Sequence, residues 1–131
     1  MRHLLAHARR HATWKRLTYQ QYNVLRIIHS EGPMPQAEIA RRLLVSAPVV
    51  TRLAGGLVDA GLLERGKDPT DRRSVRLTLT RTGRRRATAM RRDLLAAAVE
   101  LIEPLPDDRR AAVAAALDEL QVLLPRAGND R

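Results

Sequence analysis

The 131-residue sequence contains no cysteine. This absence excludes disulfides, thiolate metal sites and a cysteine-based redox switch. The sequence also has no phenylalanine, and its only aromatic residues are Trp14, Tyr19 and Tyr22. Because single-strand binders stack bases on aromatic side chains, so few rings disfavour that class of nucleic-acid binding.

Long apolar runs are missing as well. No segment is long and apolar enough to cross a membrane, and residues 9–16 are too polar for the core of a signal peptide. We therefore expect a cytoplasmic protein without a membrane partner. No glycine-rich phosphate loop or His-Glu metal motif is present, and Ser46 is better explained as a helix cap than as a nucleophile. We expect no enzymatic activity, no cofactor and no bound metal.

Positive charge is in large excess. The chain has 24 Lys and Arg against 14 Asp and Glu, which gives a formal net charge of +10. Such an excess attracts polyanions, nucleic acid first and anionic membrane second. A GC-rich coding sequence explains part of the arginine content but not the net charge. With 44% hydrophobic residues, the length fits one folded domain.

The hydrophobic period predicts a mostly helical chain that a β-hairpin interrupts once. Helices are expected over residues 2–15, from Thr18 to Gly32, over 36–43 and over 46–60. Thr18 and Gln21 have the spacing of a capping box, and Ser46 is placed as an N-cap. Residues 62–65 and 75–79 are expected to form two strands around an eight-residue polar loop, 66–73.

Two further helices are expected after Thr80, the second capped by Asp107 or Asp108 and stopped by Pro125. Their apolar stripes are Ala87, Met90, Leu94, Ala98 and Leu101, then Val113, Leu117, Leu120 and Leu124. This is more apolar surface than one small domain hides, which predicts a helical homodimer interface. The alternative is an ordinary helical hairpin packed on the core of the same chain.

A helix, a tight turn at Leu44-Val45, a second helix and a basic hairpin predict a winged helix-turn-helix. If Val50, Leu53 and Leu57 face inward, then Pro48, Arg52, Gly55 and Asp59 face outward. The DNA major groove is about 12 Å wide and admits one helix, whose N-terminal residues meet the base edges. Arg52 is suited to a bidentate contact with guanine, and Thr51 to a base or a phosphate. Ser46, Ala47, Pro48 and Val49 lie at the same end, the last three suited to apolar contact with a thymine methyl. A solvated surface position is the alternative for Arg52.

The hairpin tip, from Lys67 to Arg73, is the predicted wing. An arginine at such a tip can enter the narrow minor groove, where the negative potential is enhanced. We expect Asp71 to orient one of Arg72 and Arg73 and to leave the other free to insert. A plain solvated charge cluster is the alternative.

Four blocks at ordered spacings resemble the MarR family of winged helix-turn-helix regulators. They are Leu17-Thr-x-x-Gln21-x-x-Val24-Leu25; Gln36-x-Glu38-Ile39-Ala40-x-x-Leu43; Ser46-x-Pro48-x-Val50-Thr51-Arg52-Leu53; and Gly61-Leu-Leu-Glu-Arg65, continuing through Asp68-Pro-x-Asp71-Arg-Arg73 to Leu79-Thr80-x-x-Gly83. The resemblance implies one mostly α domain with a small β-hairpin wing. Its winged helix-turn-helix lobe would span 17–83, its helical dimerisation region 1–16 and 84–125, and its polar tail 126–131.

The resemblance also implies a function. It implies a homodimer on a palindromic double-stranded DNA operator, usually as a repressor, with a small-molecule effector site where the dimer helices meet the lobe. The expected DNA-binding residues are Gln36, Ser46, Ala47, Pro48, Val49, Thr51, Arg52, Lys67, Arg72 and Arg73, with Asp71 orienting the wing. The rival hypotheses are a nonspecific or architectural DNA-binding protein and a winged-helix protein-interaction module.

Some residues depart from the family pattern. The family usually has glycine where Leu44 stands, a Ser or Thr cap where Pro35 stands, and long polar residues in place of Gly55-Gly56. The glycine pair either lets the helix approach the DNA backbone closely or weakens binding. His3, His7 and His11 lie on one helix face with Trp14. Since three histidines spaced along a straight helix cannot converge on one ion, we interpret them as a solvated or packing face.

Overall fold

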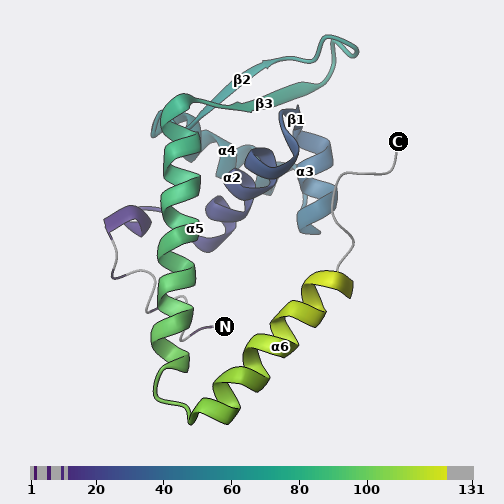
Figure 1. The fold of residues 1–131 in the computed structure, drawn as a ribbon. Helices are drawn as coiled ribbons and strands as arrows, with labels where there is room; N and C mark the ends of the chain where they lie inside the picture. The colour runs from purple at the N-terminus through teal and green to yellow at the C-terminus, as the bar shows by residue number, and fades with distance from the viewer. Residues whose placement is uncertain (1, 3–5, 7–9, 11, 124–131) are drawn as a thin grey trace.

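A helical body carries a small antiparallel sheet at one end in the computed structural model, which describes residues 2, 6, 10 and 12–123 (Figure 1). The elements are the 3-10 turn η1 (Ala12–Trp14), helix α2 (Tyr19–Glu31), strand β1 (Met34–Pro35), helices α3 (Gln36–Leu43) and α4 (Ala47–Asp59), strands β2 (Leu63–Lys67) and β3 (Val75–Leu79), and helices α5 (Arg81–Ile102) and α6 (Asp107–Leu123). The mostly helical fold with a β-hairpin wing is confirmed. Within this part of the chain, no helix is both long and apolar enough to span a bilayer.

Local capping sets where the helices of the lobe begin and end. Thr18 and Gln21 form the predicted capping box at the start of α2, and Gly32 ends that helix with a φ of 89°. Ser46 caps α4 as predicted, with its side chain accepting from the Val49 amide. Between α3 and α4, Leu44 adopts the left-handed conformation, at φ 54°, that the family usually gives to glycine. The helix-turn-helix therefore forms at the predicted positions.

The sheet has one strand more than predicted. Its order is β1-β3-β2, with Met34 opposite Leu77 and Leu63 opposite Leu79. Strand β2 continues to Lys67, so the wing loop runs over 68–74 and not over 66–73. Strand β1 has only two residues, one of them a proline, and so carries no alternating pattern that could predict it.

The core lies where α2, α4 and the sheet meet the first half of α5. Its largest fully buried side chains are Trp14, Leu25, Ile39, Leu57, Leu63, Leu77 and Met90. Val50, Leu53 and Leu57 of α4 are buried as predicted, with exposed fractions of 0%, 6% and 0%. Because one face of α4 is fixed in this core, its opposite face is available for a partner.

The segment before α2 is anchored on α5 and is not helical at its described end. The prediction of a helix over 2–15 is wrong at Ala12–Trp14, which form a 3-10 turn. The Trp14 indole N–H donates to the Met90 carbonyl at 3.1 Å, and the Thr13 hydroxyl donates to the Asp93 carboxylate. These contacts tie the segment to α5. His3, His7 and His11 lie outside the described residues.

Helix α5 buries a stripe that differs in phase from the predicted one. Ala87 and Met90 are buried as predicted, and Leu94 and Ala98 are half-buried, but Leu101 is 44% exposed. Asp93 and Ala97 are buried although they were not predicted to be. Helix α6 begins at Asp107, so Asp107 and Asp108 both lie in its first turn. The proposed stop at Pro125 lies outside the described residues. In Figure 1, α6 (yellow-green) turns back at the far end of α5 and diverges from it.

The first turn of α5 passes very close to the backbone between α4 and β2. The Leu62 carbonyl accepts from the Thr80 amide at 3.2 Å, and the Thr80 hydroxyl donates to the Gly61 carbonyl at 2.7 Å. A Cβ at Gly83 would lie 2.0 Å from the Leu62 oxygen. Only glycine therefore fits at position 83.

We predict that Gly83→Ala lowers the free energy of unfolding by about 3 kcal/mol or more, because α5 must move off the Leu62 carbonyl. Chemical denaturation with matched m-values measures the change. Gly66→Ala is the control, since a Cβ there meets nothing within 4 Å. A Gly83→Ala protein as stable as Gly66→Ala would contradict the close contact.

Candidate nucleic-acid interface

The outward face of α4 presents the residues that the sequence assigned to the DNA. Ser46, Ala47, Pro48, Thr51 and Arg52 are exposed, and Val49 is half-buried. The guanidinium of Arg52 makes no hydrogen bond or ion pair with the described residues. All six side chains occupy the first two turns of α4, so one helix end displays them together.

Gln36 braces this face from the neighbouring helix. Its Nε2 donates to the Thr51 hydroxyl at 3.2 Å, and that hydroxyl donates to the Ala47 carbonyl at 3.1 Å. The Oε1 of Gln36 is buried without a partner among the described residues. The structure thus places Gln36 between α3 and α4, where it fixes the orientation of Thr51. A direct DNA contact by Gln36 stays a prediction.

Arg65 of β2 reaches the same face and was missed by the sequence reasoning. Its Nη2 donates to the Thr51 carbonyl at 2.6 Å, although the side chain remains exposed. A Cβ at Gly55 would lie 3.6 Å from this nitrogen, so the guanidinium lies directly over the glycine. The alternation of side chains along β2 could have indicated this position, because it places Arg65 on the same face of the strand as the buried Leu63.

The second glycine of the pair faces Gln21 of α2. A Cβ at Gly56 would lie 2.8 Å from Nε2 of Gln21. The Oε1 of Gln21 accepts from the Thr18 amide at 3.0 Å in the capping box of α2. Gly56 therefore leaves room for a side chain that caps the neighbouring helix, whereas a Cβ at Gly55 would make only ordinary contact with Arg65.

A buried carboxylate, Asp68, organises the wing. Its side chain accepts from the Thr70 amide at 2.8 Å and the Thr70 hydroxyl at 2.7 Å, and it lies 3.7 Å from Nη1 of Arg76. Asp68 is only 5% exposed. The hydrogen bonds from Thr70 hold the pKa of this carboxyl below its usual value. Asp68 is thus ionised at neutral pH and bends the chain into the loop.

Asp71 acts in a different way from the one predicted. Its carboxylate accepts from the backbone amide of Arg73 at 2.9 Å and makes no ion pair with either wing arginine. It orients the backbone of the tip and does not hold a guanidinium. Lys67, Arg72 and Arg73 are exposed, and their charged groups have no partner among the described residues. Both arginines of the tip are therefore unpaired, where one was expected to be held.

We predict that Asp68→Ala disorders the wing and that Asp71→Ala does so much less, because the former removes two hydrogen bonds and an ion pair of a buried carboxylate. Amide hydrogen exchange at Thr70 and Ser74 measures the difference. Since folding lowers the pKa of Asp68, its contribution is fully present above about pH 4 and is lost as the pH falls through the lowered pKa. Equal loss of protection in the two variants would contradict this assignment.

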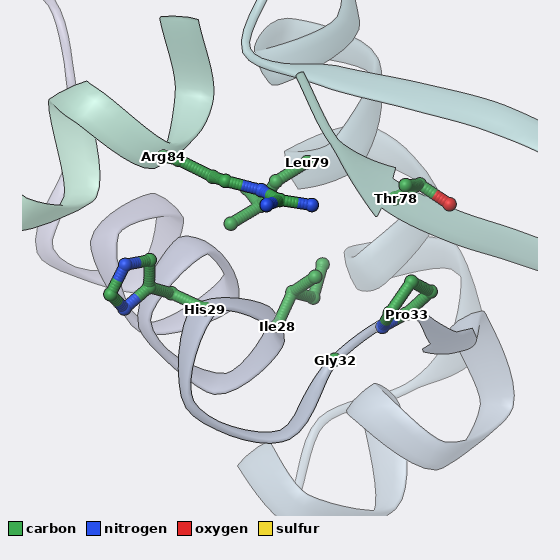
Figure 2. A pocket seen from close by; sticks show the side chains of 7 residues that line it. All are labelled: Ile28, His29, Gly32, Pro33, Thr78, Leu79 and Arg84. Atoms are coloured by element: carbon green, nitrogen blue, oxygen red, sulfur yellow. The ribbon is translucent and has the colours of Figure 1, made fainter. Parts of the chain in front are cut away.

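A pocket opens on another side of the lobe, between the end of α2, the end of β3 and the first turn of α5 (Figure 2). Its volume is about 260 Å³. The lining residues are Ile28, His29, Gly32, Pro33, Thr78, Leu79 and Arg84. Figure 2 shows the Arg84 side chain extending across the pocket from α5, with the His29 ring at its edge. No carboxylate lines this pocket, so its polar groups favour an anion.

Comparisons with known proteins agree with this geometry. Residues 17–75 match the model of the MarR family. The chain is 29% identical over 108 residues to the HTH-type transcriptional regulator ML2140 of Mycobacterium leprae, which covers 82% of this chain and 76% of that protein. Alignments with three further curated relatives span less than half of their length.

Solved structures share the whole arrangement. A cysteine-to-serine mutant of MarR from E. coli superposes with a TM-score of 0.78 at 25% identity, over 92% of this chain and 86% of that one. FabT of Streptococcus pneumoniae, solved in complex with DNA, gives 0.67 at 23% identity, over 88% and 81% of the two chains. Over residues 17–75 this chain matches the MarR family, and its fold is that of the MarR-like winged helix-turn-helix transcriptional regulators.

Proposed function

We propose that this protein is a sequence-specific, ligand-responsive repressor that binds a palindromic operator as a homodimer. The observation that supports this most directly is that Arg52 on α4 and Arg72 and Arg73 on the wing have no partner among the described residues. Three exposed guanidinium groups that no described side chain pairs with are suited to recognise a polyanion. A helix and a wing on one lobe match adjacent major and minor grooves.

In the proposed complex α4 enters the major groove by its first two turns. Arg52 donates in a fork to a guanine edge, and Thr51, already aligned by Gln36, contacts a base or a phosphate. Ala47, Pro48 and Val49 provide apolar contact. Arg72 or Arg73 enters the flanking minor groove, and Lys67 contacts the backbone. These assignments give sequence readout to α4 and positioning to the wing.

The homodimer is supported by apolar surface on the last two helices. Leu95 and Val99 of α5 are 57% and 58% exposed. Of the described side chains of α6, only Val113 is half-buried, and the others are exposed. A helix with so little burial is not stable by itself, so a second copy of the chain is the partner that we propose for it.

Ligand response is part of the same proposal. The pocket beneath Arg84 touches α2, which packs on the recognition helix α4, and also β3 of the wing and α5 of the dimer arm. An effector bound there would favour one arrangement of lobe and arm over another and so change the distance between the two recognition helices of a dimer. Repression follows if the arrangement that binds the operator prevails without the effector.

We predict that selection from random duplex DNA yields a two-fold symmetric site bound at least ~10³-fold more tightly than random duplex. The double variant Arg72→Ala/Arg73→Ala should lose most duplex binding at physiological salt, measured by fluorescence anisotropy. Recovery of tight binding without a consensus would instead favour a nonspecific architectural protein. Unchanged duplex affinity in the double variant would show that the wing assignment is wrong.

We predict that Leu95→Glu/Val99→Glu makes the protein monomeric, because buried charge without a partner destabilises an interface. Analytical ultracentrifugation measures the mass in solution. Leu44→Glu is the control, since Leu44 is 92% exposed but lies in the helix-turn-helix turn and not on α5. A dimer that survives the double change would place the interface elsewhere.

A further inference from the structure

The recognition helix has a bare surface at Gly55. In an α-helix the carbonyl of one residue bonds to the amide four positions later, so the Thr51 carbonyl lies beside Gly55. A side chain longer than that of alanine at position 55 would cover this oxygen. Glycine leaves it open, and Nη2 of Arg65 bonds to it at 2.6 Å. An arginine from the sheet therefore occupies the place that a helix side chain would take.

The pleat of β2 sends Arg65 to this place. Arg65 stands opposite Leu77 in the antiparallel register, and Leu63 stands opposite Leu79. Leu63, Leu77 and Leu79 are all buried, so Arg65 lies on the face of the hairpin that packs on the helices. Glu64 alternates to the other face. The arginine stem thus runs along α4 while its charged end stays in solvent.

The docked guanidinium keeps most of its hydrogen-bonding capacity. A guanidinium carries five N–H donors, and the only bond that Arg65 makes with the described residues uses one of them. Two acidic residues are neighbours along the same elements. Glu64 precedes Arg65 in β2 and lies on the opposite strand face, and Asp59 lies one helical turn beyond Gly55 in α4. Neither forms an ion pair with Arg65. The remaining donors are therefore free for an anion from outside the protein.

We propose that Arg65, docked on Thr51 across Gly55, is a binding site for a backbone phosphate of the operator. This inference rests on the proposed placement of α4 in the major groove. The bond to Thr51 immobilises the side chain before DNA arrives, so less conformational entropy is lost when the phosphate binds. The same bond links the wing strand to the recognition helix, so the phosphate contact sets how far both enter the grooves.

The first test compares Arg65→Gln with the wild type on the selected operator and on random duplex, over a range of salt concentrations. The plot of log K against log salt concentration has a negative slope, and each phosphate contact makes it steeper by about 0.9. Arg65→Gln should therefore make the slope shallower by about 0.9, and it should weaken binding to both duplexes by a similar factor. Arg65→Lys should keep most of the slope, because its charge remains.

Arg109→Gln is the matched control, since it removes one exposed arginine at the start of α6, which Figure 1 shows at the end of the molecule opposite the wing. Its salt slope should equal that of the wild type, once ultracentrifugation has shown that the variant keeps the wild-type mass, because α6 belongs to the proposed dimer arm. If Arg65→Gln also keeps the wild-type slope, or if it changes only thermal stability, Arg65 merely packs β2 on α4 and the phosphate site is wrong. If the wild type itself selects no site, the proposed function fails first.

The second test places a large side chain on the α4 surface at Gly55. Gly55→Leu places a neutral, helix-favouring side chain where Arg65 crosses α4, and it should reproduce the reduced slope of Arg65→Gln. The double variant should lose no more than either single one, because both changes remove the same contact. Gly55→Ala should keep the wild-type slope, since its Cβ makes only ordinary contact with the guanidinium. Additive losses from Gly55→Leu and Arg65→Gln would contradict a shared site.

Discussion

The geometry of the molecule depends on the backbone contact between Gly83 and the Leu62 carbonyl. Leu62 joins the end of α4 to the start of β2, and Gly83 lies in the first turn of α5. The absence of a Cβ at Gly83 brings these segments within van der Waals contact, and Thr80 locks them by bonding Gly61 and Leu62. The recognition helix, the wing and the dimer arm therefore meet at one rigid point.

Rigidity at that point matters because two surfaces must be read together. A recognition helix that entered the major groove at a variable angle could not place the wing tip in the next minor groove. Within the lobe, Gln36 and Arg65 both bond to Thr51, from α3 and from β2. Asp68 holds the wing loop on its own strands. The exposed cations thus stand on a braced frame, and the backbone that carries them is ordered during folding.

The sequence predicted those features that local chemistry determines. The capping box of Thr18 and Gln21, the Ser46 cap and the inward face of α4 each depend on spacings of a few residues. The phase of α5 was predicted less well, because Leu101 fits the helical period as well as Ala97 does. Whether Leu101 is buried depends on where the lobe ends along α5, which no local pattern encodes.

The errors at the site have similar causes. Asp68 and Asp71 both stand in the wing, and spacing alone does not reveal which carboxylate the loop buries. Arg65 was overlooked because its position depends on strand register and on the missing side chain of Gly55, which is close to Arg65 only in the folded molecule. The assignment of Arg52, Arg72 and Arg73 to DNA remains a proposal, although all three side chains are exposed and pair with none of the described residues.

A hydroxyl-radical footprint of the full chain on its selected operator tests the central claim most directly, because the cleavage reports access to the sugars in each groove. We expect two protected half-sites related by two-fold symmetry, with centres separated by one helical turn (about 10 base pairs) or a multiple of it. We also expect protection of the minor groove outside each half-site, where the wing tip lies. A single protected patch, or half-sites without flanking minor-groove protection, would contradict this claim.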